Sequence, residues 1–167
     1  MLILNEVLLL TLAFKNFIPT ESLLQAKSKK QLILTGAARF NAKPKSGVVF
    51  LEENNLIYAD LSPEMTKARS LATFLKGCTR IDKRLLGDFI SKPDNLDILQ
   101  AFIGLFDFKD VSLHLHISVP SLISLKKKPV AEAMRELLEA FRLPGESQQI
   151  SRITETFAST YFAAKPG

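Results

Sequence analysis

The sequence predicts an all-α protein, an irregular array of short stacked helices with one non-helical insertion. Apolar residues recur every three or four positions along most of the chain, which is the period of an amphipathic helix. Proline or capping residues precede several of these stretches, and short polar or turn segments follow them. A length of 167 residues with 47% hydrophobic residues suits one domain that buries a core.

Charge and cysteine content narrow the classes of function. The net charge is +5 and the sequence pI is about 9.4, but basic residues cluster only at Lys29-Lys30 and at residues 126–128. We therefore expect no nucleic-acid partner. Cys78 cannot form an internal disulfide, and two histidines make no Cys/His metal cluster. We expect no metal or cofactor, and a reducing cytosolic setting.

The N-terminal run of residues 2–14 is apolar but is interrupted by Asn5 and Glu6. It is too short to span a bilayer, and it lacks the basic region and cleavage site of a secretory signal. We interpret residues 1–28 as a leader of uncertain status, either an amphipathic or buried helix or a non-native leader.

Four helices are expected in the first part of the chain. The first covers residues 23–38, and the second begins at Pro44 and ends near residue 54. Ser62 is predicted to cap a third helix with Pro63 at its first position, and Asp82 to cap a fourth. Leu71, Phe74 and Leu75 are expected to form the buried face of the third helix. The other apolar residues that mark the four helices are Leu23, Leu24, Ile33, Leu34, Val48, Val49, Leu51, Leu56, Leu85, Leu86, Phe89 and Ile90.

Three longer apolar stripes follow at helical spacing. They comprise Leu96, Leu99, Phe102, Ile103 and Phe106; Val130, Met134, Leu137, Leu138 and Phe141; and Ile150, Ile153, Phe157 and Tyr161.

Residues 111–127 break the helical pattern, because apolar and polar residues alternate there as in a strand. A single strand in a helical chain has no partner. His114 and His116 would project from one side, but two ligands without a third do not make a metal site. We interpret the segment as a solvated or partly ordered insertion.

The turn after residue 141 reads Arg142-Leu143-Pro144-Gly145-Glu146. Proline removes a backbone donor, and Gly145 is expected to adopt angles closed to other residues, so the pair ends one helix and directs the next. Glu146 is expected in the first turn of that next helix, where the helix dipole stabilises an anion. On this evidence alone, a capping charge is its usual role.

Three blocks of this sequence, residues 29–57, 70–108 and 130–167, resemble the first part of a Sec-seven domain. That domain is the catalytic domain of guanine-nucleotide exchange factors for ADP-ribosylation-factor (ARF) GTPases. The blocks are most similar to the large Golgi exchangers of the brefeldin A-resistance type. The string FRLPGE with Gln148 after it is the most specific part of the resemblance.

The resemblance implies that Glu146 is a glutamic finger that enters the nucleotide pocket of the GTPase. There it would compete with phosphates held by a lysine and Mg²⁺. A like-charge pair at about 4 Å is worth on the order of 4 kcal/mol at an effective dielectric near 20, or about three decades of affinity. Exchange of this kind needs no covalent chemistry. The GTPase-binding residues that the resemblance implies are Arg142, Leu143, Pro144, Gly145, Gln148, Ile150, Ile153 and Phe157.

Core packing remains an equal alternative for Ile153 and Phe157, because a stripe alone does not separate core from groove. The resemblance calls for further helices after Gly167, including the second wall of the GTPase groove. We therefore expect the stripe through Ile153 and Phe157 to lose cover, at roughly 1.5 to 3 kcal/mol for each large exposed side chain. The expected consequence is a marginally stable fragment or one that needs a partner. An exchange-inactive fragment that only binds the GTPase or a partner chain is the alternative function.

The resemblance places one partial domain at residues 29–167, interrupted at 111–127 by a genuine insertion or a retained intron. The implied partner is an ARF-family GTPase in its GDP-bound and nucleotide-free forms. The implied location is cytoplasmic and peripheral at Golgi membranes, through flanking domains.

Overall fold

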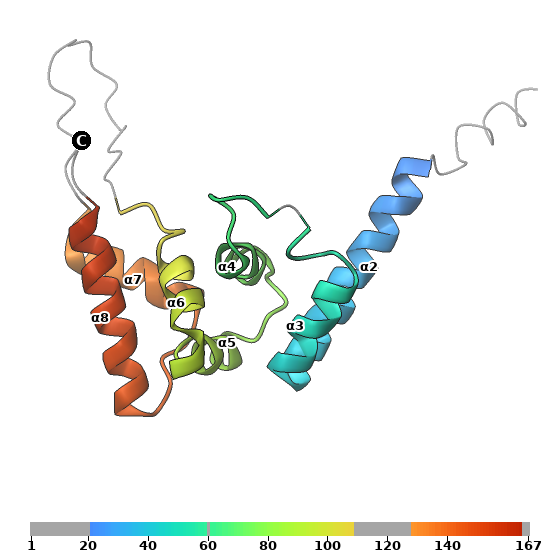
Figure 1. Cartoon of the computed structure of the whole chain (residues 1–167). Helices are drawn as coiled ribbons and strands as arrows, with labels where there is room; N and C mark the ends of the chain where they lie inside the picture. The colour runs from blue at the N-terminus through green and yellow to red at the C-terminus, as the bar shows by residue number, and fades with distance from the viewer. Residues whose placement is uncertain (1–20, 60, 109–127, 165–167) are drawn as a thin grey trace, which may run out of the picture. The chain divides into compact units, whose positions relative to one another are not determined.

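The computed structural model describes residues 21–59, 61–108 and 128–164 (Figure 1). The chain divides into two compact units, Met1–Thr35 and Gly36–Gly167. Every regular element in the described ranges is helical, which confirms the predicted all-α class. The elements are α2 (Glu21–Ala42), α3 (Pro44–Glu53), α4 (Lys67–Gly77), α5 (Lys83–Ile90), the 3-10 turn η1 (Pro93–Asn95), α6 (Leu96–Ile103), α7 (Val130–Ala140) and α8 (Ser147–Ala163).

The described part of the first unit is the beginning of α2. This helix has 22 residues, so it starts earlier and ends later than the predicted helix at 23–38. It runs without a break through position 28, where the sequence analysis ends the leader, and that boundary stays a prediction. The predictions for residues 2–14 concern residues outside the described ranges. No helix among the described residues is long and apolar enough to cross a membrane.

Two predicted helix starts in the second unit are confirmed. Pro44 is the first residue of α3, and the helix ends with Asn54 as its C-cap. Asp82 is the N-cap of α5, and its Oδ1 accepts hydrogen bonds from the amides of Arg84 at 2.8 Å and Leu85 at 3.1 Å. The Asp82 carboxylate satisfies donors that the first turn of α5 leaves unpaired, whereas Pro44 brings no amide hydrogen to the first turn of α3.

The predicted start of α4 at Ser62 is wrong. Residues 62–65 form a turn in which the amide of Met65 donates to the carbonyl of Ser62, and Ser62 donates to Met65 in return. The N-cap is Thr66, whose hydroxyl accepts from the amide of Arg69 at 3.2 Å. Thr66, four residues after Ser62, therefore caps α4 in place of the Ser-Pro pair.

Helix α6 lies at the centre of the second unit, in contact with α4 on one side and α8 on the other (Figure 1). Leu99, Phe102 and Ile103 on α6 are fully buried. The predicted stripes start one turn too early, because Leu96 is 41% exposed and Val130 is 50% exposed. Both are the first residues of their helices.

Aromatic rings join α6 to α8. Phe106 stacks on Phe108, Phe108 meets Phe157 edge to face with centroids 5.5 Å apart, and Phe157 stacks on Tyr161. Such pairs add stability beyond the area that they bury. Ile153 is 1% exposed and Phe157 is 3% exposed. The expectation that this stripe loses its cover is therefore wrong, and Phe108 supplies part of the cover over Phe157.

The two ends of the segment that precedes α7 meet. The amide of Lys128 donates to the carbonyl of Phe108 at 3.1 Å, and the Tyr161 hydroxyl donates to the carbonyl of Lys128 at 2.7 Å. Lys128 Nζ also lies 2.6 Å from Glu136 Oε2. We call this arrangement the Phe108/Lys128 junction. The predicted strand and insertion at 111–127, with both histidines, lie outside the described residues.

Candidate functional site

The turn between α7 and α8, residues 141–146, carries the predicted site. Phe141 ends α7 with an extended backbone, and its ring is fully buried against Phe102 with centroids 6.1 Å apart. Pro144 is also buried, whereas Arg142 and Leu143 between them are exposed. Two buried side chains thus hold the turn on the core and leave the others facing solvent.

Glu146 is the N-cap residue of α8, one position before the predicted one. Its backbone is extended, with φ −88° and ψ 128°, and its side chain makes no capping hydrogen bond. Glutamate is not among the residues that cap helices well, because asparagine, aspartate, serine and threonine are preferred there. The structure thus places Glu146 at the helix start, where the predicted dipole interaction acts, without a capping hydrogen bond. The carboxylate is exposed to solvent beside the positive end of α8.

Gly145 does not have the conformation that the sequence predicts. No described glycine has a positive φ, and a Cβ built on Gly145 meets no atom within 4 Å. The backbone angles and the space at this position would accept a side chain. The constraint on the shape of the turn therefore comes from other residues.

That constraint comes from α5. The amide of Arg142 donates to the carbonyl of Lys83 at 2.9 Å, and Lys83 Nζ donates to the carbonyl of Glu139 at 2.6 Å. Gly87 lies one turn further along α5, where a Cβ would overlap the carbonyl oxygen of Arg142. The turn rests directly on the backbone of α5, and this close approach requires glycine at position 87.

The same helix also holds the beginning of α8. Arg152 Nε donates to the carbonyl of Ser91, the C-cap of α5, at 2.7 Å. Ser91 is fully buried, and its hydroxyl donates to the carbonyl of Gly87 at 2.7 Å. A cationic side chain on the last carbonyls of a helix is favourable because the helix dipole is negative there.

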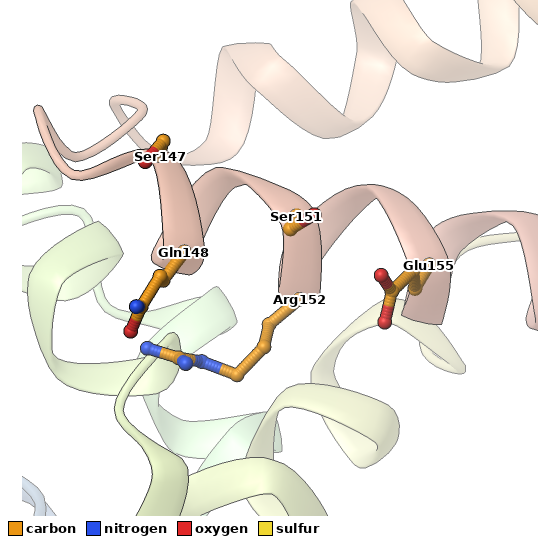
Figure 2. A pocket seen from close by; sticks show the side chains of 5 residues that line it. All are labelled: Ser147, Gln148, Ser151, Arg152 and Glu155. Atoms are coloured by element: carbon orange, nitrogen blue, oxygen red, sulfur yellow. The ribbon is translucent and has the colours of Figure 1, made fainter.

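An open hollow of about 330 Å³ lies along the first turns of α8. Its lining is polar, and Gln148 and Arg152 extend toward the same side of the helix (Figure 2). The residues that line it are Ser147, Gln148, Ser151, Arg152 and Glu155. All of these residues are on α8, the helix that has Glu146 as its N-cap.

The predicted contact residues fall into two groups. Those next to Glu146 are exposed, and those further along α8 face the core. Exposed are Arg142, Leu143, Gly145 and Gln148; Ile150 is partly buried; Pro144, Ile153 and Phe157 are buried. The second group can support a binding surface from beneath, but within this chain its side chains are already covered.

Sequence reasoning missed Gly87, Ser91 and Arg152. No local pattern marks Gly87 or Ser91, because their partners are distant in the chain, 61 residues away in the case of Arg152 and Ser91. Arg152 lies four residues after Gln148, and this spacing predicts that the two side chains are neighbours on one helix face. It does not predict a contact between Arg152 and α5.

A protein-family model described as the Sec7 domain matches residues 29–118 and 115–167. Among curated proteins, cytohesin-3 of Homo sapiens is 36% identical over 141 residues, which is 83% of this chain and 29% of the relative. The Golgi-specific brefeldin A-resistance guanine nucleotide exchange factor 1 homolog of Caenorhabditis elegans is 30% identical over 142 residues, 85% of this chain and 6% of the relative. The chain therefore spans less than a third of the length of either relative.

Among solved structures, a Sec7 domain bound to ARF1-GDP and complexed with brefeldin A is similar to this fold. The TM-score is 0.63 at 36% identity, and the match covers 84% of this chain and 61% of that chain.

Proposed function

This chain belongs to the Sec7 domain family, and on that premise we propose that it acts as a guanine-nucleotide exchange factor for ARF-family GTPases, with Glu146 as its finger. The solved Sec7 domain that it matches is bound to ARF1-GDP, and the relative in Caenorhabditis elegans is described as a guanine nucleotide exchange factor. Exchange requires no covalent step, since the chain only has to favour the nucleotide-free GTPase.

The observation that carries the proposal is the state of Glu146. Its carboxylate is exposed, makes no capping hydrogen bond, and stands on a turn fixed to the core by Phe141 and Pro144. An exposed carboxylate that makes no capping hydrogen bond, on a backbone that is held by the core, can be presented to a partner without first breaking such a bond. This supports a role in binding or exchange over a role in stability.

The mechanism is electrostatic. A carboxylate that enters a nucleotide pocket competes with the phosphates for the same cations and repels them. At about 4 Å and an effective dielectric near 20 the repulsion is on the order of 4 kcal/mol, which corresponds to about three decades in nucleotide affinity. The cost of bringing the charge close is met by the rest of the contact surface.

The residues around Glu146 supply that surface. Leu143 is apolar and 45% exposed, so covering it with a partner is favourable. Arg142 and Gln148 are exposed on either side of the carboxylate and offer hydrogen-bond donors. Ile153 and Phe157 act beneath this surface, as buried support for α8.

A second candidate is a chain that binds the GTPase, or a partner chain, without accelerating exchange. The observation that favours it is coverage, because this chain matches 61% of the solved Sec7 domain. A protein can bind a GTPase and still fail to stabilise its nucleotide-free form.

The proposed location is the cytoplasmic side of Golgi membranes, with peripheral association through flanking domains. We propose this location because the name of the Caenorhabditis elegans relative describes it as Golgi-specific.

The test is release of a fluorescent GDP from an ARF-family GTPase in excess unlabelled nucleotide. The chain should accelerate release, and Glu146→Lys should abolish the acceleration because it reverses the charge of the finger. Glu64→Lys is the matched control, since Glu64 is exposed in the 62–65 turn, away from the proposed finger, and it should behave as wild type.

Acceleration that survives in Glu146→Lys would contradict the finger. Retention of the GTPase on immobilised chain without any acceleration would support the binding-only alternative. If the chain neither retains the GTPase nor accelerates GDP release, the proposed exchange function is wrong for this chain.

A further inference from the structure

We propose that α5 acts as a brace that fixes the position of the Glu146 carboxylate, with Gly87, Ser91 and Arg152 as positioning residues. This inference rests on the proposed function of Glu146. It adds Gly87 and Ser91 on α5, and Arg152 further along α8; in the proposal these residues touch neither the carboxylate nor the nucleotide.

The first half of the brace lies before Glu146. Arg142 donates its amide to the carbonyl of Lys83, and its own carbonyl lies against the bare Cα of Gly87. Because both contacts involve backbone atoms, their geometry depends little on side-chain rotamers. They fix the chain four residues before the carboxylate.

The second half lies after Glu146. The Nε–H of Arg152 donates to the carbonyl of Ser91 at 2.7 Å, a short distance typical of a charge-assisted hydrogen bond. The Ser91 hydroxyl donates to the carbonyl of Gly87, so the two halves share one residue of α5. They hold the chain on both sides of a side chain that has no capping bond of its own.

A catalytic charge is sensitive to this kind of support, because a misplacement of about 1 Å can lower a rate by about 100-fold. Burial of Phe141, Pro144 and Gln149 holds this region against the core, and the brace adds hydrogen bonds to α5 on both sides of Glu146. The brace therefore predicts that changes on α5 affect exchange more than they affect stability.

The first test compares Gly87→Ala with Gly77→Ala. A Cβ at Gly77 meets nothing within 4 Å, whereas at Gly87 it meets the carbonyl of Arg142. We expect Gly87→Ala to lower the maximal rate of GDP release by about 100-fold. The chain concentration for half-maximal rate should change by less than about threefold, because the binding surface is intact. Gly77→Ala should match wild type in both.

The second test keeps the inference falsifiable if Gly87→Ala does not fold. Arg152→Ala removes a hydrogen bond to a charged group, and the maximal rate should fall by about tenfold. Arg152→Lys keeps a cationic donor and should recover most of the rate, which loss of packing alone would not explain. Arg135→Ala is the matched control, because Arg135 is exposed on α7.

A third readout is independent of the GTPase. The amide of Arg142 is bonded to Lys83, so its hydrogen exchange is expected to be slow in wild type and in both controls, and faster in Gly87→Ala and Arg152→Ala. If wild type fails to accelerate GDP release, the proposed function falls, and this readout still decides whether α5 holds the turn. Unchanged Arg142 exchange, or wild-type release rates in both variants, would overturn the brace.

Discussion

The 141–146 turn and the Phe108/Lys128 junction both connect parts of the helical core, but they are held in different ways. The turn depends on another element, because α5 bonds to the backbone of Arg142 and to the side chain of Arg152. The junction is closed mainly by its own ends, through the amide of Lys128 and the carbonyl of Phe108. The contacts with α5 fix the backbone of the turn, whereas the hydrogen bond between Lys128 and Phe108 holds the two ends of the junction together.

This difference separates two uses of a connection. A turn that must present a charge gains from contacts with a neighbouring helix, since its position then follows the core. A closed junction allows the intervening chain to vary in length at small cost, because loop-closure entropy changes slowly with length. The predictions below test the two arrangements, from the largest expected effect to the smallest.

The largest expected effect is on the packing of α8. This helix follows the 141–146 turn and contacts the Phe108/Lys128 junction through Phe157 and Tyr161. Phe157→Ala removes a buried ring that contacts Phe108 and Tyr161. We expect the free energy of unfolding to fall by about 3 to 5 kcal/mol, measured by chemical denaturation. Phe162→Ala is the control, since Phe162 is 70% exposed. A similar loss in both variants would mean that burial of the Phe157 ring is not what holds α8.

The next effect concerns the junction. Deleting residues 111–127 makes Phe108, Lys109, Asp110 and Lys128 consecutive, and the carbonyl of the first already accepts from the amide of the fourth. That bond is the one that defines a β-turn. We expect the free energy of unfolding to stay unchanged or to rise by at most about 2 kcal/mol. Thermal unfolding followed by circular dichroism measures it.

Deleting residues 111–128 is the control for this prediction. It removes one residue more and places Pro129, which has no amide hydrogen, in the fourth position of the turn. The control should be less stable than the first deletion, and equal stability would contradict the closed junction. A genuine insertion and a retained intron both fit this geometry, and amplification of the transcript across the segment distinguishes them.

A smaller effect is expected from Tyr161→Phe. The change removes the hydroxyl that donates to the carbonyl of Lys128, and a bond of this kind contributes about 1 kcal/mol. Amide exchange should rise at Lys128 and stay unchanged at Arg142, because the turn has a separate support. Equal increases at both amides would show that the two regions are not independent.

The smallest effect concerns the ion pair at the junction. The hydrogen bond with Glu136 raises the pKa of Lys128. A raised lysine pKa stabilises the fold below the unfolded value and loses that effect as pH rises through the folded value. Glu136→Gln should therefore cost about 0.2 to 1 kcal/mol at neutral pH, and the difference from wild type should shrink at alkaline pH. Glu139→Gln, at an exposed position on the same helix, is the control.

The parts of the fold that the sequence predicts well are those decided by neighbours in the chain. Asp82 caps its helix and Pro44 begins one because both effects act within a single turn. The predicted start of α4 is wrong because Ser62 and Thr66 can both cap a helix, and the structure uses Thr66.

At the site, the sequence identifies the carboxylate but not what holds it. It assigns the conformational demand to Gly145, whereas the structure requires glycine at position 87. The contact that creates this demand joins α5 to a turn more than fifty residues later, and no local pattern encodes such a contact. The cover over Phe157 likewise includes a ring that is distant in the chain, that of Phe108.

The central claim is that the carboxylate of Glu146 makes the GTPase bind nucleotide more weakly when this chain is bound. Linkage makes this measurable, because a chain that weakens nucleotide binding must itself bind the nucleotide-loaded GTPase more weakly by the same factor. The measurement is the ratio of Kd values for the GDP-bound and nucleotide-free GTPase, in wild type and in Glu146→Gln. The account predicts that the variant loses about three decades of this ratio. An equal ratio in the two chains would contradict it.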